Sequence, residues 1–317
     1  MVKDIYELLN IQYPIIQGGM GNISNAQLTA AVSEAGGLGT IGCGTMSPNE
    51  VEKIILDTKK KTNKPFAVNI AINVSPHTEA LIELVIKHQI PVVSLSAGNP
   101  APFIDKLKEK DIKVLVIVAA VKHAKKAEEA GADAIVAEGV EAAGINSPLE
   151  STTFTLIPQI VDNVQIPVIA AGGIGDGRGL AAAFMLGASG VQMGTRFIAT
   201  KEAPFHQKYK DAILLASDTT TKVIGRSLGK PRRVIPTEYT INLDGLESKG
   251  LTSKEFDRLT SETYHIRGAI EGNFKEGFIN GGQVSGLIHS IPTVKELFEE
   301  MMDDARKQID IVQKFFS

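Results

Sequence analysis

Two clusters of glycine follow short apolar runs between Ile166 and Phe197. The first is AAGGIGDG, residues 170–177, and the second begins MGTRF at residue 193. Glycine lets the backbone approach a ligand closely and adopt a positive φ, although it weakens any element that it interrupts. Backbone N–H groups gathered in two such loops can hold one anion without basic side chains. We expect a phosphate site made by the amides of Gly172, Gly173, Ile174, Gly194 and Thr195.

One glycine cluster alone would suit a tight turn equally well, so the pairing of the two clusters favours the anion site. The other familiar glycine motifs are absent from the sequence. No G-x-G-x-x-G register fits residues 172–179, and no G-x-x-x-x-G-K-[ST] motif occurs. These absences argue against a Rossmann dinucleotide site and a P-loop.

Two polar residues lie within or directly after apolar runs. Glu138 follows AIVA, and Asn69 lies inside FAVNIAIN. A carboxylate at the end of a strand is a candidate acid or base, with a solvated loop acid as the alternative. A buried amide needs hydrogen-bond partners, so Asn69 is a candidate ligand contact, with a purely structural bond as the alternative. Glu141 is expected to be structural.

The six histidines show no metal-binding spacing. His206, in EAPFHQKY, is nevertheless a candidate catalytic residue, with capping of the next helix as the alternative. Cys43 is the single cysteine, which excludes an internal disulfide. It follows an apolar run and is expected to be a small buried residue.

Lys230, Arg232 and Arg233 form a compact basic cluster in GKPRRV. Such a cluster is usually a solvated loop. The alternative is a receptor for a pyrophosphate, from NADH or from the pantetheine arm of an acyl carrier.

The composition is that of an ordinary globular protein: 317 residues, 43% hydrophobic and 22% charged. The net charge of −3 argues against nucleic-acid or anionic-membrane partners. The longest apolar run, Val114–Val121, is too short to span a bilayer, and the N-terminus MVKDIYELLN lacks the apolar segment of a secretory signal. We expect a cytoplasmic protein.

Short apolar runs alternate with helical patterns along the first 200 residues. Their continuous apolar character is typical of parallel strands that are buried on both faces. The expected strands are Pro14–Gln17, Leu38–Ile41, Phe66–Ile70, Val92–Leu95, Val114–Val118, Ala134–Ala137, Val168–Ala170 and Val191–Met193. The expected helices are Asn25–Ala35, Pro48–Lys61, Thr78–His88, Ile104–Lys110, Lys122–Ala130, Thr153–Val161 and Gly177–Leu186.

Eight βα units of this size predict an α/β fold, a (β/α)₈ TIM barrel, with a doubly wound open sheet as the alternative. We assign residues 1–216 to the barrel. The polar residues 217–285 are expected to form a mostly helical insertion or lid, and residues 286–317 to return to the barrel as a C-terminal helix. In such a barrel the two glycine loops follow the seventh and eighth strands, where many barrels bind a phosphate.

Eight short motifs extend over essentially the whole chain. They are YPIIQGGMG (13–21), AGGLGTIG (35–42), KPFAVNI (64–70), AGNP (97–100), GADAIVAEGVEAAG (131–144), PVIAAGGIGDGRG (167–179), VQMGTRF (191–197) and GGQVSGLI (281–288). Together they resemble the nitronate monooxygenase (2-nitropropane dioxygenase) family, which includes FMN-dependent enoyl-ACP reductase II and NADH:quinone reductases.

The resemblance implies an FMN-containing barrel. Gly18, Gly19 and Met20 would lie against the flavin ring, and Asn69 would bond its polar edge. Glu138 would lie near the ribityl chain or the ring. The residues implied to hold the phosphate are Gly172, Gly173, Gln192, Met193, Gly194 and Thr195.

The sequence departs from the family in one motif. The glycine of the family's EAxG motif is commonly followed by histidine, whereas here Gly144 is followed by Ile145 and then Asn146. Isoleucine has no proton to exchange, and asparagine hydrogen-bonds without titrating near neutrality. Asn146 is therefore the candidate catalytic residue at this motif.

The resemblance implies an FMN-dependent oxidoreductase that uses NADH or NADPH and passes hydride to a quinone, an enoyl thioester or oxygen. The alternatives are nitronate oxidation with O₂, a phosphate-binding barrel isomerase or lyase without flavin, and an inactive FMN-binding protein. The expected partner is a small-molecule substrate, with an acyl carrier protein thioester as one candidate and a homodimer as the candidate assembly.

Overall fold

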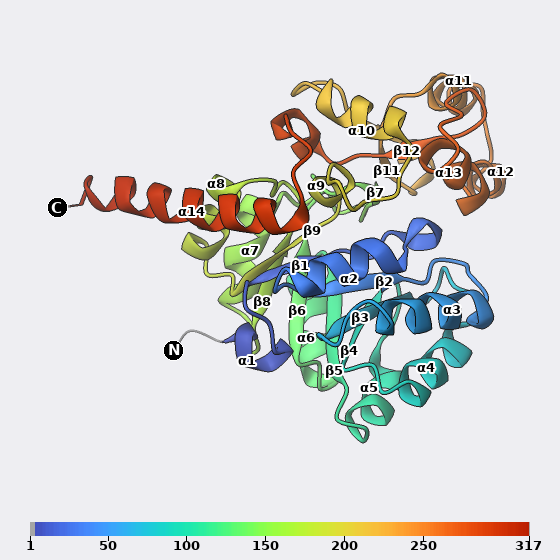
Figure 1. The fold of residues 1–317 in the computed structure, drawn as a ribbon. Helices are drawn as coiled ribbons and strands as arrows, with labels where there is room; N and C mark the ends of the chain where they lie inside the picture. Colours follow the sequence, from blue (N-terminus) through green and yellow to red (C-terminus); the bar gives the residue numbers. More distant parts are fainter. Residues whose placement is uncertain (1–3, 317) are drawn as a thin grey trace.

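A computed structural model describes residues 4–316 of the chain. Eight parallel strands form one sheet in the order β1-β9-β8-β6-β5-β4-β3-β2 (Figure 1). Their bounds are β1 Ile15–Gln17, β2 Gly39–Gly42, β3 Phe66–Ala71, β4 Val92–Ser96, β5 Lys113–Val118, β6 Ala134–Glu138, β8 Val168–Ala171 and β9 Gly190–Met193. Each lies within two residues of a predicted strand.

Hydrogen bonds between the first and last strands of this order close the sheet into a barrel. The amide of Gln17 donates to the Leu38 carbonyl at 2.9 Å, and the amide of Leu38 donates to the Ile15 carbonyl at 3.1 Å. The predicted (β/α)₈ barrel is confirmed, and the open doubly wound sheet is excluded.

Helices follow the strands and cover the outside of the barrel (Figure 1). Their ends are set by local signals that the sequence contains. Ser47 and Glu50 form a capping box at the start of α3, and the Asp176 carboxylate accepts from two amides at the start of α8. The helix bounds are α2 Ala26–Glu34, α3 Pro48–Lys59, α4 Thr78–Lys87, α5 Ala101–Lys108, α6 Val121–Glu129, α7 Thr153–Val161 and α8 Gly177–Met185.

A short N-terminal helix closes one end of the barrel. Helix α1, Ile5–Leu9, buries Ile5 and Leu9 in a cluster with side chains from the barrel interior such as Leu115. A Cβ built on Gly190, where β9 begins, would lie 2.3 Å from the Ile5 side chain. Because the amino ends of the strands are plugged in this way, a ligand site is left to their carboxyl ends.

Residues 217–285, which we call the lid, lie over that open end (Figure 1). The lid contains the helices α11 Glu238–Glu247, α12 Ser253–Leu259 and α13 Glu262–Ala269, and the strands β10 Lys222–Ile224, β11 Arg232–Ile235 and β12 Ile279–Asn280. These strands pair antiparallel, and β7, Gly144–Ile145 of the barrel loop, pairs with β11. The small sheet, whose strands have two to four residues, is an addition to the predicted helical insertion. The residue limits of the three parts stay a prediction.

The chain leaves the barrel through α9 Thr195–Ile198 and α10 Gln207–Leu214, and it returns as α14 Val294–Gln313. Helix α14 packs so closely on α8 that a Cβ on Gly177 would lie 2.5 Å from the Met301 carbonyl. Three short 3₁₀ turns complete the described residues: η1 Gly21–Ile23, η2 Arg226–Leu228 and η3 Gln283–Leu287. In residues 4–316 no helix has both the length and the apolar character that crossing a bilayer requires.

Candidate active site

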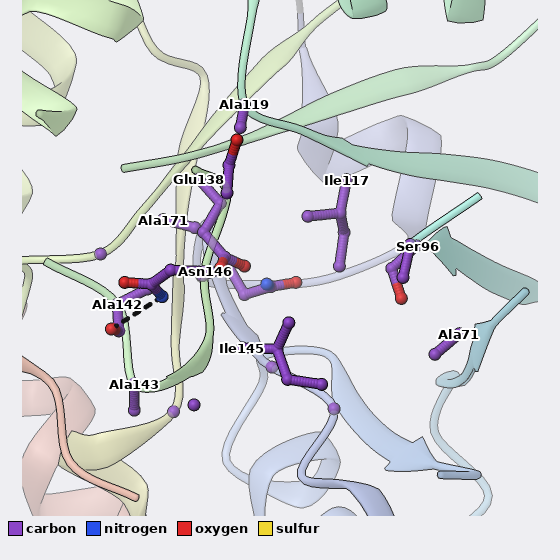
Figure 2. Close-up of a pocket in the computed structure, with 18 of the residues that line it drawn as sticks. Ala71, Ser96, Ile117, Ala119, Glu138, Ala142, Ala143, Ile145, Asn146 and Ala171 are labelled. Carbon is purple, nitrogen blue, oxygen red and sulfur yellow. Dashed lines mark hydrogen bonds between the residues drawn. The ribbon is translucent and has the colours of Figure 1, made fainter. Parts of the chain in front are cut away.

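A cavity of about 1090 Å³ lies between the carboxyl ends of the barrel strands and the lid. Figure 2 shows part of its wall, including Glu138, Ile145 and Asn146. Nearly all of the predicted site residues meet here. Those that line the cavity are Gly18, Gly19, Met20, Asn69, Glu138, Asn146, Gly172, Gly173, Gln192, Met193, Gly194 and Thr195.

The two glycine loops follow β8 and β9, as predicted, and both lie in the cavity wall. Gly172 and Gly173 have φ values of 94° and 74°, which side chains rarely adopt. A Cβ built on Gly194 would meet nothing within 4 Å. Within residues 4–316 the amides of Gly173 and Gly194 have no hydrogen-bond acceptor. Free amides beside open space are what an oxyanion such as a phosphate requires.

Two of the predicted phosphate residues use their side chains elsewhere. The Thr195 hydroxyl accepts from the amide of Gly282 at 3.0 Å, which fixes the turn after β12. The Met193 side chain is buried in the core, and its carbonyl accepts from the amide of Gly18 at 2.8 Å. Met193 can therefore reach a ligand through its backbone only, whereas the Thr195 hydroxyl can still donate its proton.

Asn69 presents a free oxygen at the bottom of the cavity. Its Nδ2 group donates to the carbonyl and hydroxyl oxygens of Ser94 and to the hydroxyl of Ser96, at 3.2–3.3 Å. These bonds fix the amide so that Oδ1 faces the Gly19 backbone, and a Cβ on Gly19 would lie 2.5 Å from it. No donor in the described residues reaches this Oδ1. Asn69 is therefore oriented to accept a hydrogen bond from a ligand N–H group.

Glu138 ends β6 and lies half-buried in the cavity wall (Figure 2). Burial raises the pKa of its carboxyl group to about 7, and no hydrogen bond or neighbouring charge in residues 4–316 offsets that effect. A carboxyl group that titrates near neutrality can both give and take a proton at working pH.

The raised pKa of Glu138 predicts a pH-dependent cost to stability. The unfolded carboxyl releases its proton near pH ~4.3, whereas the native one holds it to about 7. The native state therefore loses stability as pH rises between these values, and the whole cost persists above the native pKa. We expect Glu138→Gln to be more stable than the wild type at pH 8.5 by on the order of 2 kcal/mol, with a smaller difference at pH 5.5. Urea unfolding of ligand-free protein at both pH values measures this, and an equal difference at the two values would contradict it.

Asn146 and Ile145 extend toward opposite sides of β7 (Figure 2). Asn146 is 6% exposed and donates from Nδ2 to the Ala142 carbonyl at 3.1 Å, while its Oδ1 is buried without a partner in the described chain. Ile145 is 55% exposed and borders the cavity. The apolar side chain thus occupies the accessible position. Asn146 faces the loop backbone, although its orphaned oxygen leaves one acceptor available.

His206 does not line the cavity. Its Nδ1 accepts from the amide of Lys208 at 3.2 Å, and the residue caps α10. The ring packs against Gly272, where a Cβ would lie 2.4 Å from Nδ1. The structure therefore gives His206 the capping role that was the alternative and places it away from the other candidates.

Glu141 has structural hydrogen bonds although it also lines the cavity, and the expected burial of Cys43 is confirmed. The Glu141 carboxylate accepts from the amide and hydroxyl of Thr153 at 2.9–3.0 Å, which ties the β6 loop to α7. Cys43 is fully buried, and burial raises the pKa of its thiol to about 12.

The basic cluster is not a solvated loop. Arg232 and Arg233 belong to β11 and are 8% and 6% exposed, while Lys230 forms an ion pair with Asp257 at the surface. Arg233 donates to the Val140 carbonyl at 3.0 Å and to the Thr221 hydroxyl at 3.3 Å. Of these three cations, only Arg232 lines the cavity.

The lid adds cavity residues that were not predicted. Glu262 and His265 come from α13, with the Glu262 carboxylate 3.2 Å from Nδ1 of His265. Asn280 comes from β12, and its Nδ2 lies 3.2 Å from Nε2 of His265. Tyr209 donates to the Asn280 carbonyl at 2.5 Å. No local pattern marks these residues, because the pairing of short strands from distant segments brings them together.

A (β/α)₈ barrel with free amides at the ends of its last two strands and a lid over its mouth is a ligand-binding barrel of the kind that enzymes use. The chain belongs to the nitronate monooxygenase family, whose model matches residues 3–80 and 71–304. This is an oxidoreductase family.

Several individual proteins are similar to the chain. FabK from Thermotoga maritima superposes with a TM-score of 0.94, at 42% identity and over 98% of each chain. A "(3aS,4S,5R,7aS)-5-hydroxy-7a-methyl-1-oxo-octahydro-1H-indene-4-carboxyl-CoA dehydrogenase" from Rhodococcus jostii is 35% identical over 96% of each chain. A probable nitronate monooxygenase from Staphylococcus saprophyticus is 38% identical over 73% of this chain and 78% of the relative.

Proposed function

We propose that the chain is an FMN-dependent NAD(P)H oxidoreductase that delivers reducing equivalents to a quinone, an enoyl thioester or oxygen. The observation that supports it best is the pair of glycine loops at the ends of β8 and β9, with free amides beside open space at Gly194. Bound FMN would supply a carrier for two electrons.

The chain's own residues fit this group at three points. The amides of Gly173 and Gly194 would bind the phosphate oxygens. Oδ1 of Asn69 would accept from a ring N–H group, because its Nδ2 is already bonded to Ser94 and Ser96. Glu138 can hold a proton at the cavity wall near neutral pH. Ile145 adds an apolar surface at the border of the cavity.

Nitronate oxidation is the second candidate, and it is favoured by the family model and by the staphylococcal relatives. The relative from R. jostii is named as a dehydrogenase of a coenzyme A thioester, which favours an acyl thioester among the reaction partners proposed here. A barrel isomerase or lyase that binds only a substrate phosphate remains the alternative from another class.

The absorption spectrum of the purified protein tests the proposal. We expect flavin absorption bands and release of FMN on denaturation. In the absence of oxygen, addition of NADH or NADPH should abolish the flavin band at ~450 nm within seconds. A colourless protein that does not take up FMN would leave the isomerase or lyase reading. A flavoprotein that neither nicotinamide nor nitronate reduces would be an inactive FMN binder.

A further inference from the structure

Arg232 is a buried cation in the part of the cavity wall that the lid provides. The residue is 8% exposed, its guanidinium carbon lies 5.1 Å from the centre of the Phe278 ring, and burial lowers its pKa. Its one hydrogen bond is long: Nη1 donates to Oδ1 of Asn280 at 3.5 Å. In residues 4–316 no carboxylate forms an ion pair with it. A charge this deeply buried is ordinarily paired.

The two remaining nitrogens, Nε and Nη2, are free and still accessible. Neither has a partner in the described chain, and neither is sealed from solvent-accessible space, unlike Nε of Arg196. Nε–H and Nη2–H lie along the same edge of the guanidinium plane. This edge matches the two oxygens of a carboxylate, to which it can donate two parallel hydrogen bonds.

The charges around Arg232 favour a single negative charge over a phosphate dianion. Glu262 acts on Arg232 electrostatically and already balances part of its charge. Burial works to raise the pKa of Glu262, but the hydrogen bond and charge of His265, the charge of Arg232 and a hydrogen bond from the Asn22 backbone together lower it. Lys230 is paired with Asp257, whose carboxylate also acts electrostatically on Arg232, and Arg233 donates to the Val140 carbonyl and does not line the cavity.

An apolar surface lies directly beside the free edge. Arg232 stands opposite Ile145 in the register of β11 and β7, so the two side chains share one face of the small sheet. Ile145 is 55% exposed and borders the same cavity. A ligand that placed an anionic end on Arg232 would therefore lay an apolar body along Ile145.

We propose that Arg232 is the receptor for a planar, two-oxygen monoanion, a carboxylate or the isosteric nitronate, at one end of an otherwise apolar substrate. The identification of this ligand as the substrate rests on the proposed function. The binding itself does not, because it can be measured without nicotinamide and without turnover.

Calorimetric titration of the protein as purified tests the receptor, with butyrate, butyl-1-nitronate and inorganic phosphate as separate probes in an anaerobic cell. We expect a monoanion to bind and its Kd to rise about tenfold or more in Arg232→Met. Arg232→Lys should recover little of the affinity, because an ammonium group lacks the two parallel N–H donors of the guanidinium edge. Lys230→Met removes a cation two residues away outside the cavity and should leave the Kd within about twofold.

The titrations with butyrate and with the nitronate distinguish the two kinds of substrate that could carry the anion. Tighter binding of butyrate identifies a carboxylate-bearing substrate, and tighter binding of the nitronate, with bleaching of the flavin, identifies a nitronate. Binding of neither monoanion, or binding that Arg232→Met and Arg232→Lys leave unchanged, overturns the proposal. Phosphate binding that is tighter than that of either monoanion and that Arg232→Met weakens overturns it as well. Thermal unfolding of each variant checks the fold, and the visible spectrum reports separately whether flavin is present.

Discussion

Gly194→Val is expected to purify as a folded but colourless protein whose Kd for FMN is at least ~100-fold above that of the wild type. A Cβ at Gly194 would have no atom within 4 Å apart from those of the two adjoining residues, so the protein has room for it. It would instead occupy the space beside the free amide of Gly194 and exclude the phosphate oxygens. Loss of two charge-assisted hydrogen bonds accounts for a change of about this size. Reconstitution of stripped protein with FMN, followed by flavin fluorescence, measures the Kd.

A matched control is available in the lid. Gly245 on α11 is exposed, and its Cβ would likewise meet nothing within 4 Å. Gly245→Val should therefore bind FMN as the wild type does. Full flavin occupancy in Gly194→Val would show that this loop is not the phosphate site. Gly173→Val is a poorer test, because its φ of 74° would strain any side chain whether or not a ligand binds there.

The barrel and the glycine loops were predictable because their signals are local. Each strand is a continuous apolar run, and parallel strands buried on both faces require this. The glycines follow the strands directly, so their position at the carboxyl ends follows from the fold alone. Asn69 and Glu138 were found for the same reason: each is a polar residue in or after an apolar run.

The wall that the lid provides could not be predicted, because its contacts are between distant segments. Arg232 pairs with Ile145, 87 positions earlier, and meets Asn280, 48 positions later. A run such as GKPRRV looks solvated in sequence, and only the packing of Arg232 over Phe278 reveals that it is buried. The sequence did not distinguish the two roles offered for His206, and the structure shows the local one, in which Nδ1 caps α10.

Ile145→His is expected to raise kcat/KM for alkyl nitronates by on the order of 100-fold, from a low value in the wild type. Ile145 occupies the position where the family commonly has histidine, and it is 55% exposed beside the cavity (Figure 2). A nitronate is already deprotonated, so its oxidation needs no base. It gains from a further donor, beyond Arg232, that holds its oxygens, and isoleucine has none. An imidazole at this position would supply that donor next to Arg232, its partner across the strands.

Reduction by NADH or NADPH should change little in the same variant, because hydride transfer depends on stacking and an apolar pocket rather than on a protein base. We expect the rate of flavin reduction in this variant to stay within about threefold of the wild-type rate, which corresponds to a change of less than ~1 kcal/mol in the activation free energy. Ile145→Phe is the matched control, since it adds a ring without a polar atom and should not raise nitronate oxidation. Steady-state assays with propionate-3-nitronate, and with NADH plus a quinone, compare the three proteins. If the phenylalanine variant gains as much nitronate activity as the histidine variant, the shape of residue 145 limits the reaction and hydrogen bonding does not. If the wild type already prefers nitronate to NADH, Arg232 alone holds the nitronate oxygens, and nitronate oxidation replaces NAD(P)H oxidation as the favoured function.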